Sequence, residues 1–281
     1  SQAIQTTFAC KPHTVKIAQQ SSWQIQKSVV FALFIRELKT RFGRFKLGYL
    51  WAVLDPLFTI SALCLIRVAM GSGKIAGLEF PIFYASGMLI YKLFGSIGTA
   101  AIGLVESNLS LMNYQRIKPM DPIIARSILE IIISAASMAT ILGGLYWLGF
   151  EFAWNDTLGF IGVFLLMCAF SFGIGCAFAT VGLLFQEFKK IAPIVIQPLF
   201  FISGIFFSTN SIPEHLLPYL LWNPILHAVE LGRSTMFVEY HCRHASWTYL
   251  AGSALISVAF GLSLFRLYRR KLVTSGSVKL V

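Results

Sequence analysis

Six long apolar runs, separated by short polar segments, account for most of this chain. A helix needs roughly 20 apolar residues to cross a hydrocarbon core of about 30 Å, and each run approaches that length. The runs extend from Leu50 to Met70, Phe80 to Leu104, Ala125 to Leu148, Leu158 to Phe185, Ile191 to Ser208 and Tyr249 to Leu267. Hydrophobic residues make up 56% of the sequence, which is more apolar area than a soluble fold can bury. We therefore predict an all-α integral membrane protein with six transmembrane helices.

Basic residues gather in alternate gaps between these runs. They lie before the first run, between the second and third, between the fourth and fifth, and after the sixth. Because cytoplasmic loops are enriched in Lys and Arg, these gaps and both chain termini are predicted to be cytoplasmic. The formal net charge of +11 is therefore a signal of orientation and of attraction to membrane lipids, and it indicates no nucleic-acid partner.

The residues before the first run divide into a tail and an amphipathic helix. Residues 1–22 are the predicted N-terminal tail. In residues 23–47, apolar side chains recur at roughly helical spacing among basic residues, as is typical of a helix on the membrane surface. The apolar members are Trp23, Val30, Phe34 and Leu38. Residues 48–281 then form a single six-span transmembrane domain.

A proline-rich segment, approximately residues 209–240, precedes the last run. Pro213, Pro218 and Pro224 break it into apolar stretches that are too short or too polar to cross a membrane singly. Irregular backbone at membrane depth is tolerated only where protein or a water-filled cavity satisfies its polar groups. We expect a pair of re-entrant half-helices that dip in from outside, and the alternative is an external loop with interfacial helices.

A polar segment, approximately residues 112–121, connects the second and third runs on the predicted cytoplasmic side. Pro119 and Pro122 limit any helix here to a short one that protrudes from the membrane. Its mixture of Tyr, Ile and Met with Arg and Lys is typical of a protein-docking surface, although a plain connection remains the alternative. The residues that we expect to dock are Asn113, Tyr114, Gln115, Arg116, Ile117, Lys118 and Pro119.

Asp55 places a carboxylate beside Pro56 near the start of the first run. An ionisable residue inside a membrane span is costly and is a candidate functional residue by default. The alternative is that Asp55 lies at headgroup level, paired with Lys46 or a neighbouring arginine.

The chain carries no convincing nucleotide, metal or catalytic motif. Residues 71–74 (GSGK) imitate the end of a phosphate-binding loop, but Val68 and Ile75 stand where that motif requires Gly and Ser or Thr. The external His and Glu residues are too scattered for a membrane-bound glycosyltransferase or acyltransferase. We therefore expect no metal site, no cofactor bound by this chain, and no enzymatic activity.

Three blocks of sequence resemble the permease subunits of bacterial polysaccharide ABC exporters. Arg36 to Pro56 resembles the entrance to the first span of those subunits, and Asn113 to Glu130 resembles their coupling segment. Ile212 to Arg233, through Trp222-Asn223-Pro224, resembles the segment before their last span. The order and spacing of the blocks agree as well, so the resemblance covers nearly the whole chain. It is strongest to the capsular-polysaccharide (KpsM-like) branch, in which an acidic residue precedes the proline at position 56.

This resemblance implies a homodimer in the bacterial inner membrane, with two copies of a separate cytoplasmic ABC ATPase that binds ATP and Mg. It implies that residues 23–47 are a gate helix at the cytoplasmic entrance and that residues 112–121 include a coupling helix. Further partners implied are periplasmic and outer-membrane capsule export proteins.

The resemblance also assigns residues to the path of a lipid-linked, acidic polysaccharide. The substrate entrance would use Arg36, Lys39, Arg41, Arg44, Lys46 and Asp55. The channel would be lined by Tyr49, Trp51, Phe58, Phe200, Phe201 and Phe207. From spacing alone, Phe200, Gly204 and Phe207 share one helical face, which in most membrane proteins packs against lipid. Anchoring to anionic lipids is likewise the alternative role of the basic residues.

Together these features predict a channel-forming subunit that moves capsular polysaccharide from cytoplasm to periplasm. The alternative is a permease of the same fold that exports O-antigen, teichoic acid, or a smaller lipid or drug.

Overall fold

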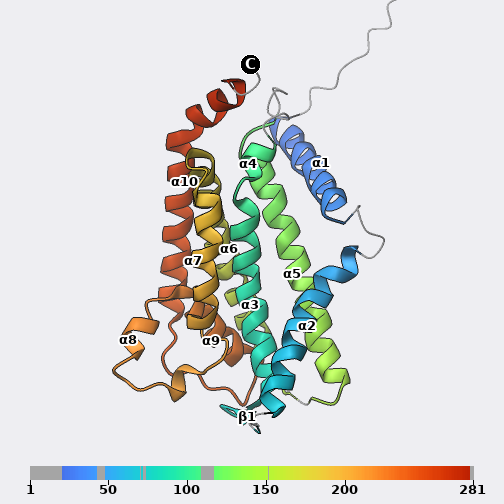
Figure 1. The fold of residues 1–281 in the computed structure, drawn as a ribbon, viewed down its shortest axis with the longest axis vertical. Helices are drawn as coiled ribbons and strands as arrows, with labels where there is room; N and C mark the ends of the chain where they lie inside the picture. Colours follow the sequence, from blue (N-terminus) through green and yellow to red (C-terminus); the bar gives the residue numbers. More distant parts are fainter. Residues whose placement is uncertain are drawn as a thin grey trace, which may run out of the picture.

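A computed structural model describes residues 21–42, 48–69, 71, 74–108, 117–150 and 152–278, and they fold into a helical bundle (Figure 1). The long helices are α1 (Ser22–Phe42), α2 (Gly48–Ala69), α3 (Phe80–Ala101), α5 (Asp121–Trp147), α6 (Thr157–Leu184), α7 (Phe188–Ile202), α9 (Pro224–Met236) and α10 (Trp247–Val278). Short helices are α4 (Leu104–Ser107), α8 (Leu217–Leu220) and the 3-10 turn Thr209–Ser211. The strands β1 (Lys74–Ile75) and β2 (Leu78–Glu79) form an antiparallel hairpin.

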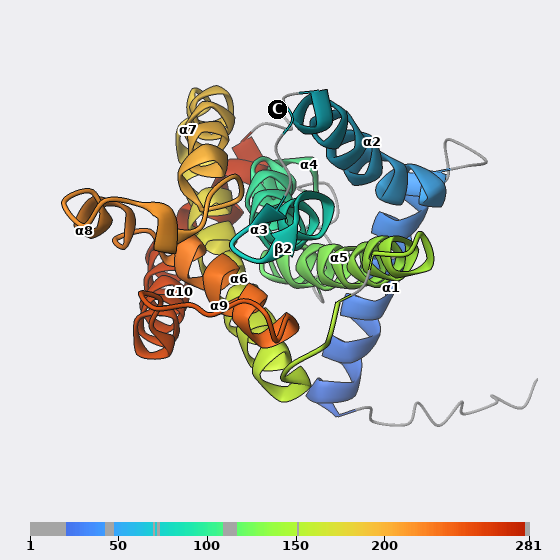
Figure 2. The same ribbon diagram turned by 90° about the horizontal axis from the view of Figure 1, so that it is seen from below.

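Helix α3 lies at the centre of the bundle, with α2, α5, α6 and α9 packed around it (Figure 2). Its side chains Phe83, Tyr84 and Leu93 are completely buried.

Helix α10 packs along α6 at very short range. A Cβ atom on Gly261 would lie 2.1 Å from the backbone oxygen of Gly173, so only glycine permits this approach.

The bundle has two distinct ends. One, here called the α4 end, carries α4, α1 and the C-terminal end of α10 (Figure 1). The other, here called the hairpin end, carries the β1–β2 hairpin, α8 and α9. The connections in which basic residues gather lie at the α4 end. The acidic residues Glu79, Asp156 and Glu239 lie at the hairpin end.

The prediction of a helical membrane protein is confirmed, although the helix boundaries differ from those of the apolar runs. Within the described residues, four helices are long and apolar enough to cross a membrane: α3, α5, α6 and residues 247–268 of α10. Helix α7 has only 15 residues, because the helix ends at Ile202 and not at Ser208. Helix α5 begins at Asp121, before the apolar run, with Pro122 in its first turn, where a missing N–H costs nothing.

Helix α1 packs against α5. Of its expected apolar members, Val30, Phe34 and Leu38 are half-buried and Trp23 is 76% exposed. Leu33 and Glu37 are buried, so ionic contacts with α5 make up part of the buried face. An interfacial position of α1 at a membrane stays a prediction.

Two further local expectations can be compared with the structure. Of the expected coupling helix, approximately residues 112–121, residues 112–116 lie outside the described residues, and residues 117–120 are not helical and end in a turn that leads into α5. In the segment 209–240, only α9 is a buried helix. The expected partner half-helix is the single turn α8, around which Tyr219 and Trp222 are each 82% exposed.

Candidate functional site

An ionic network joins α1 to α5 at the α4 end. Arg126 donates a hydrogen bond to Glu37 at 2.9 Å and lies 3.1 Å from Glu130, which also accepts from Arg41. The Glu130 side chain is 2% exposed. A buried carboxylate flanked by two guanidinium groups holds both helices, since removing either cation leaves a charge without compensation. Two more polar contacts extend the connection, because Gln26 donates to Asp121 and Arg36 donates to Asn108 at 2.8 Å.

These contacts involve two of the basic residues that were expected at the substrate entrance. Arg41 is paired with the carboxylate of Glu130, whereas Arg36 donates one hydrogen bond to the neutral amide of Asn108 and keeps its positive charge exposed. Lys39 is exposed, while Arg44 and Lys46 lie outside the described residues. Glu37, Arg126 and Glu130 were not among the residues expected at the site. The i, i+4 spacing of Arg126 and Glu130 was a readable signal, but their partners on α1 were not.

The expected docking segment is described only at its C-terminal end. Asn113, Tyr114, Gln115 and Arg116 lie outside the described residues. Ile117 is half-buried, Lys118 is exposed and Pro119 is buried. The Lys118 backbone N–H donates to Asp121 at 2.8 Å, which closes the turn on the first residue of α5. Any force applied to this turn therefore acts directly on α5, to which α1 is joined.

One face of α2 carries a row of exposed side chains. Trp51, Asp55 and Phe58 follow the i, i+4, i+7 spacing of one helical face, and Trp51 and Phe58 are 66% and 61% exposed. Asp55 accepts a hydrogen bond from Lys92 of α3 at 2.5 Å, a partner that was not predicted from the sequence. Lys46, which the alternative interpretation named as a partner, lies outside the described residues. The side chain of Tyr49 is not described.

The aromatic residues of α7 do not form the single stripe that their spacing predicts. Phe200 packs inward, with its ring centroid 5.2 Å from that of Tyr91, whereas Phe201 is 61% exposed. Phe207 lies beyond the end of the helix. The chain leaves α7 through Gly204 at φ 73°, a conformation that favours glycine. The prediction that Phe200, Gly204 and Phe207 share one helical face is therefore wrong.

Arg233 of α9 fixes this break in the chain. Its completely buried guanidinium donates to the carbonyl oxygens of Gly204 at 2.6 Å, Ile205 at 3.1 Å and Phe83 at 3.0 Å. The same group lies 3.6 Å above the centroid of the Phe83 ring. One cation therefore joins α3, α9 and the segment after α7, and it satisfies the carbonyls of Gly204 and Ile205, which lie beyond the end of α7.

Glu230, one turn before Arg233, organises the other side of this cluster. Its carboxylate accepts hydrogen bonds from the hydroxyls of Thr209 and Tyr240, each at 2.8 Å, and it lies 3.6 Å from Arg233. Burial raises the pKa of the Tyr240 phenol, and the negative charge of Glu230 raises it further, so Tyr240 stays a donor. The segment after α7 is thus held by buried polar groups of α9 and of the loop that follows it.

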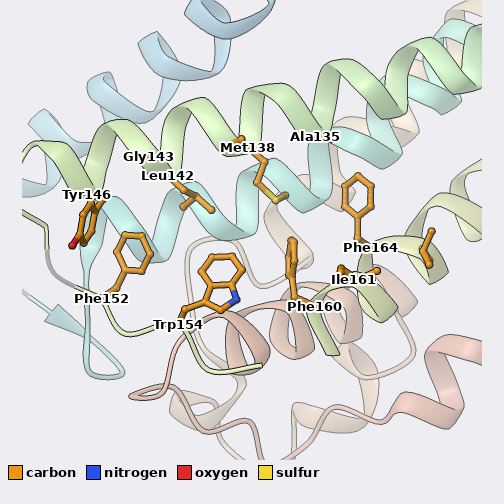
Figure 3. A pocket seen from close by; sticks show the side chains of 12 residues that line it. Ala135, Met138, Leu142, Gly143, Tyr146, Phe152, Trp154, Phe160, Ile161 and Phe164 are labelled. Atoms are coloured by element: carbon orange, nitrogen blue, oxygen red, sulfur yellow. The ribbon is translucent and has the colours of Figure 1, made fainter. Parts of the chain in front are cut away.

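A lateral groove opens between α5 and α6 near the hairpin end (Figure 3). Its volume is about 590 Å³, and aromatic side chains such as Tyr146, Phe152, Trp154 and Phe160 form much of its wall. Among the described residues, no charged side chain lines it. The described wall of the groove therefore fits hydrocarbon.

Known proteins resemble the chain along most of its length. Residues 28–237 match the ABC-2 type transporter family. The polysialic acid transport protein KpsM of Escherichia coli is 38% identical over 256 residues, which cover 91% of this chain and 99% of that protein. Two capsule polysaccharide export inner-membrane proteins also match. CtrC of Neisseria meningitidis is 27% identical, covering 85% of this chain and 91% of its own, and BexB of Haemophilus influenzae is 29% identical, covering 88% and 93%.

Proposed function

Because this chain belongs to the ABC-2 type transporter family, we propose that it is the channel-forming subunit of an ATP-driven exporter of lipid-linked capsular polysaccharide. It would move the polymer from cytoplasm to periplasm across the bacterial inner membrane. The observation that carries this proposal is similarity over nearly the whole chain to proteins whose names specify capsule or polysialic acid export. The exposed row of Trp51, Asp55 and Phe58 supports it, because sugars stack on aromatic rings and an exposed charge needs water.

In this proposal six helices cross the membrane, with α2 and α7 added to the four most apolar ones. The α4 end faces the cytoplasm, as the positive-inside rule requires, and both termini lie there. The buried helix α9 is a re-entrant element that enters from the periplasmic side. Its network around Arg233 and Glu230 supports this, since non-spanning backbone inside a membrane must have its polar groups satisfied by protein.

The working unit is proposed to be a homodimer with two copies of a cytoplasmic ABC ATPase, which binds the ATP and Mg. In each subunit the ATPase would bind residues 113–119. Movement of this segment would reach the turn at Lys118 and Asp121, then α5, and then α1 through the network centred on Glu130. Helix α1 would thereby act as the gate at the cytoplasmic entrance. Periplasmic and outer-membrane capsule export proteins would receive the polymer.

Co-purification with the ATPase tests this assignment. Changing Arg116 and Ile117 to Glu places two negative charges in the docking segment, and we expect the ATPase to be lost from the purified complex. Lys74 and Ile75 form the same basic–apolar pair at the hairpin end, so the double change of these residues to Glu is the matched control. A full complement of ATPase on the Arg116 and Ile117 variant would refute the docking site. Failure of the wild-type chain to bind any ABC ATPase would refute the proposed function.

A further inference from the structure

A charge pair joins α2 and α3 on the exposed face of α2. Lys92 is the only charged residue of α3, and its Nζ lies 2.5 Å from Oδ2 of Asp55 on α2. At 1.5 Å of rise per residue, Asp55 is about 10 Å from the first residue of α2, and Lys92 is about 14 Å from the last residue of α3. In the proposed six-span arrangement, both charges therefore lie within the depth that the hydrocarbon of a membrane occupies.

The pair is only partly shielded by its own subunit. The side chains of Lys92 and Asp55 are 31% and 61% exposed. Within the described residues, each of them forms its only hydrogen bond with the other, so two ammonium protons and most of the carboxylate lone pairs require further partners. Lipid tails supply none. The face must therefore meet water, a second subunit or a polar ligand.

The surroundings of the pair favour a polar ligand that is bulky and passes along the face. Trp51 lies one turn before Asp55, and Phe58 lies one turn after it on the same side of α2. Aromatic rings flanking a charge suit a chain of sugars, whose apolar ring faces stack while their charged substituents meet the cation. The groove between α5 and α6 has aromatic rings but no charged side chain among its described lining residues.

We infer that Lys92 is the anion-binding residue of the export path and that Asp55 is its counter-ion when the path is empty. The inference rests on the proposed function. A carboxylate or phosphate of the passing substrate takes the place of Asp55 at the ammonium group. Asp55 then lies beside the bound anion and repels it. Lys92 is paired before, during and after passage, which avoids the cost of an unpaired charge at this depth.

This exchange of partners selects acidic polymers. A neutral polysaccharide has nothing to replace Asp55, so it would have to pass a closed ion pair. The anion has two sources, the acid groups of the sugars and the phosphate of the lipid anchor. Asp55 and Lys92 thus have unequal roles: loss of Lys92 removes the binding group, whereas loss of Asp55 removes only its competitor.

A protection experiment on the reconstituted permease–ATPase complex tests the inference. The reporter is Phe58→Cys, on a background in which the native cysteines are replaced by Ala, and the probe is a membrane-impermeant thiol reagent. Leu255→Cys on α10, at a position that is 73% exposed, is the lipid-facing control that the reagent should not reach. Protection is measured with polysialic acid oligomers, with neutral dextran of matched length, and with a lipid phosphate that carries no sugar.

We expect polysialic acid to protect Phe58→Cys from the thiol reagent. The change Lys92→Gln should raise the concentration of polysialic acid required for this protection by about tenfold or more. In Lys92→Arg the required concentration should stay within about threefold of that of the parent. In Asp55→Asn it should be equal to that of the parent or lower. If the pair were merely structural, Asp55→Asn would raise the required concentration as much as Lys92→Gln does. That result overturns the inference. Dextran protection equal to that of polysialic acid overturns it as well.

The lipid arm identifies the source of the anion. Lys92-dependent protection by the lipid phosphate alone assigns the site to the anchor, and its absence assigns the site to the sugar acids; both support an anion site. Protection of the parent by polysialic acid that Lys92→Gln leaves unchanged refutes the role of Lys92 alone. Absence of protection of the parent by every probe refutes the proposed path, and the site with it.

Discussion

Gly87 is the residue at which the buried cluster around Arg233 is most sensitive to a small change. A Cβ atom at this position would lie 2.4 Å from Nη2 of Arg233 and 3.3 Å from Cα of Ile205. Carbon and nitrogen atoms pack at about 3.5 Å, so in a Gly87→Ala variant the guanidinium must retreat by about 1 Å. Such a movement breaks the 3.0 Å hydrogen bond to Phe83 and loosens the break after α7.

The expected cost follows from three effects. Overpacking in a filled core costs about 1–3 kcal/mol. Loss of a hydrogen bond to a charged group costs about 1.5–3 kcal/mol. Alanine in place of glycine inside a helix recovers about 0.5–1 kcal/mol. The net destabilisation of Gly87→Ala is therefore about 2–5 kcal/mol.

Gly252→Ala on α10 is the matched control, since nothing lies within 4 Å of the Cβ that it would add. Thermal unfolding of the detergent-solubilised protein can be followed with a thiol-reactive dye, because Cys168 and Cys176 are buried. We expect the melting temperature of Gly87→Ala to fall by at least about 5 °C, at roughly 2–4 °C per kcal/mol, and that of Gly252→Ala to hold or rise.

A second variant tests whether Arg233 is the cause. Lysine is slimmer than arginine, so Arg233→Lys should cost less stability in the Gly87→Ala background than in the wild type, with a coupling energy of about 1 kcal/mol or more. Additive effects of the two changes, or equal melting temperatures for Gly87→Ala and Gly252→Ala, would refute this description of the cluster.

Two further predictions concern the ends of the path. Glu130→Gln leaves Arg41 without its carboxylate and Arg126 with Glu37 alone, so trypsin should cleave α1 about tenfold faster or more, whereas Glu79→Gln at the hairpin end should change nothing. Unchanged cleavage would show that α1 is held by other contacts. Phe201→Ala should lower export without lowering the melting temperature, while Phe200→Ala, which removes an inward ring, should destabilise the protein by about 3–5 kcal/mol. Equal stability of the two alanine variants would contradict their opposite orientations.

The helices could be predicted because length and apolarity are local properties. The residues at which the helices end could not be predicted in this way. The run from Ile191 to Ser208 is apolar across the break at Gly204, and hydropathy does not register a turn. What ends α7 is a cation 29 residues further along the chain, which donates to carbonyls that a continuing helix would have used. A prediction from spacing alone therefore placed Phe207 on a helix that does not reach it.

The site was partly accessible from sequence. Asp55 was recognised because a carboxylate in an apolar run is costly, and the same argument applied to Lys92, the only charge in its helix, would have found its partner. Glu130 also lies inside an apolar run, from Ala125 to Leu148, so the same argument applied to it. Glu37 was different, because it lies among the charged residues of α1, and only the packing of α1 on α5 shows that it is buried.

The location of the polysaccharide tests the central claim most directly. The gene for this chain is deleted in its own bacterium, and capsular polysaccharide is measured at the cell surface and in the cytoplasmic fraction, with its lipid anchor. We predict that the polymer is made but stays inside the cell in lipid-linked form, and that the wild-type gene returns it to the surface. A deletion strain with the parental amount of surface polysaccharide would contradict the claim.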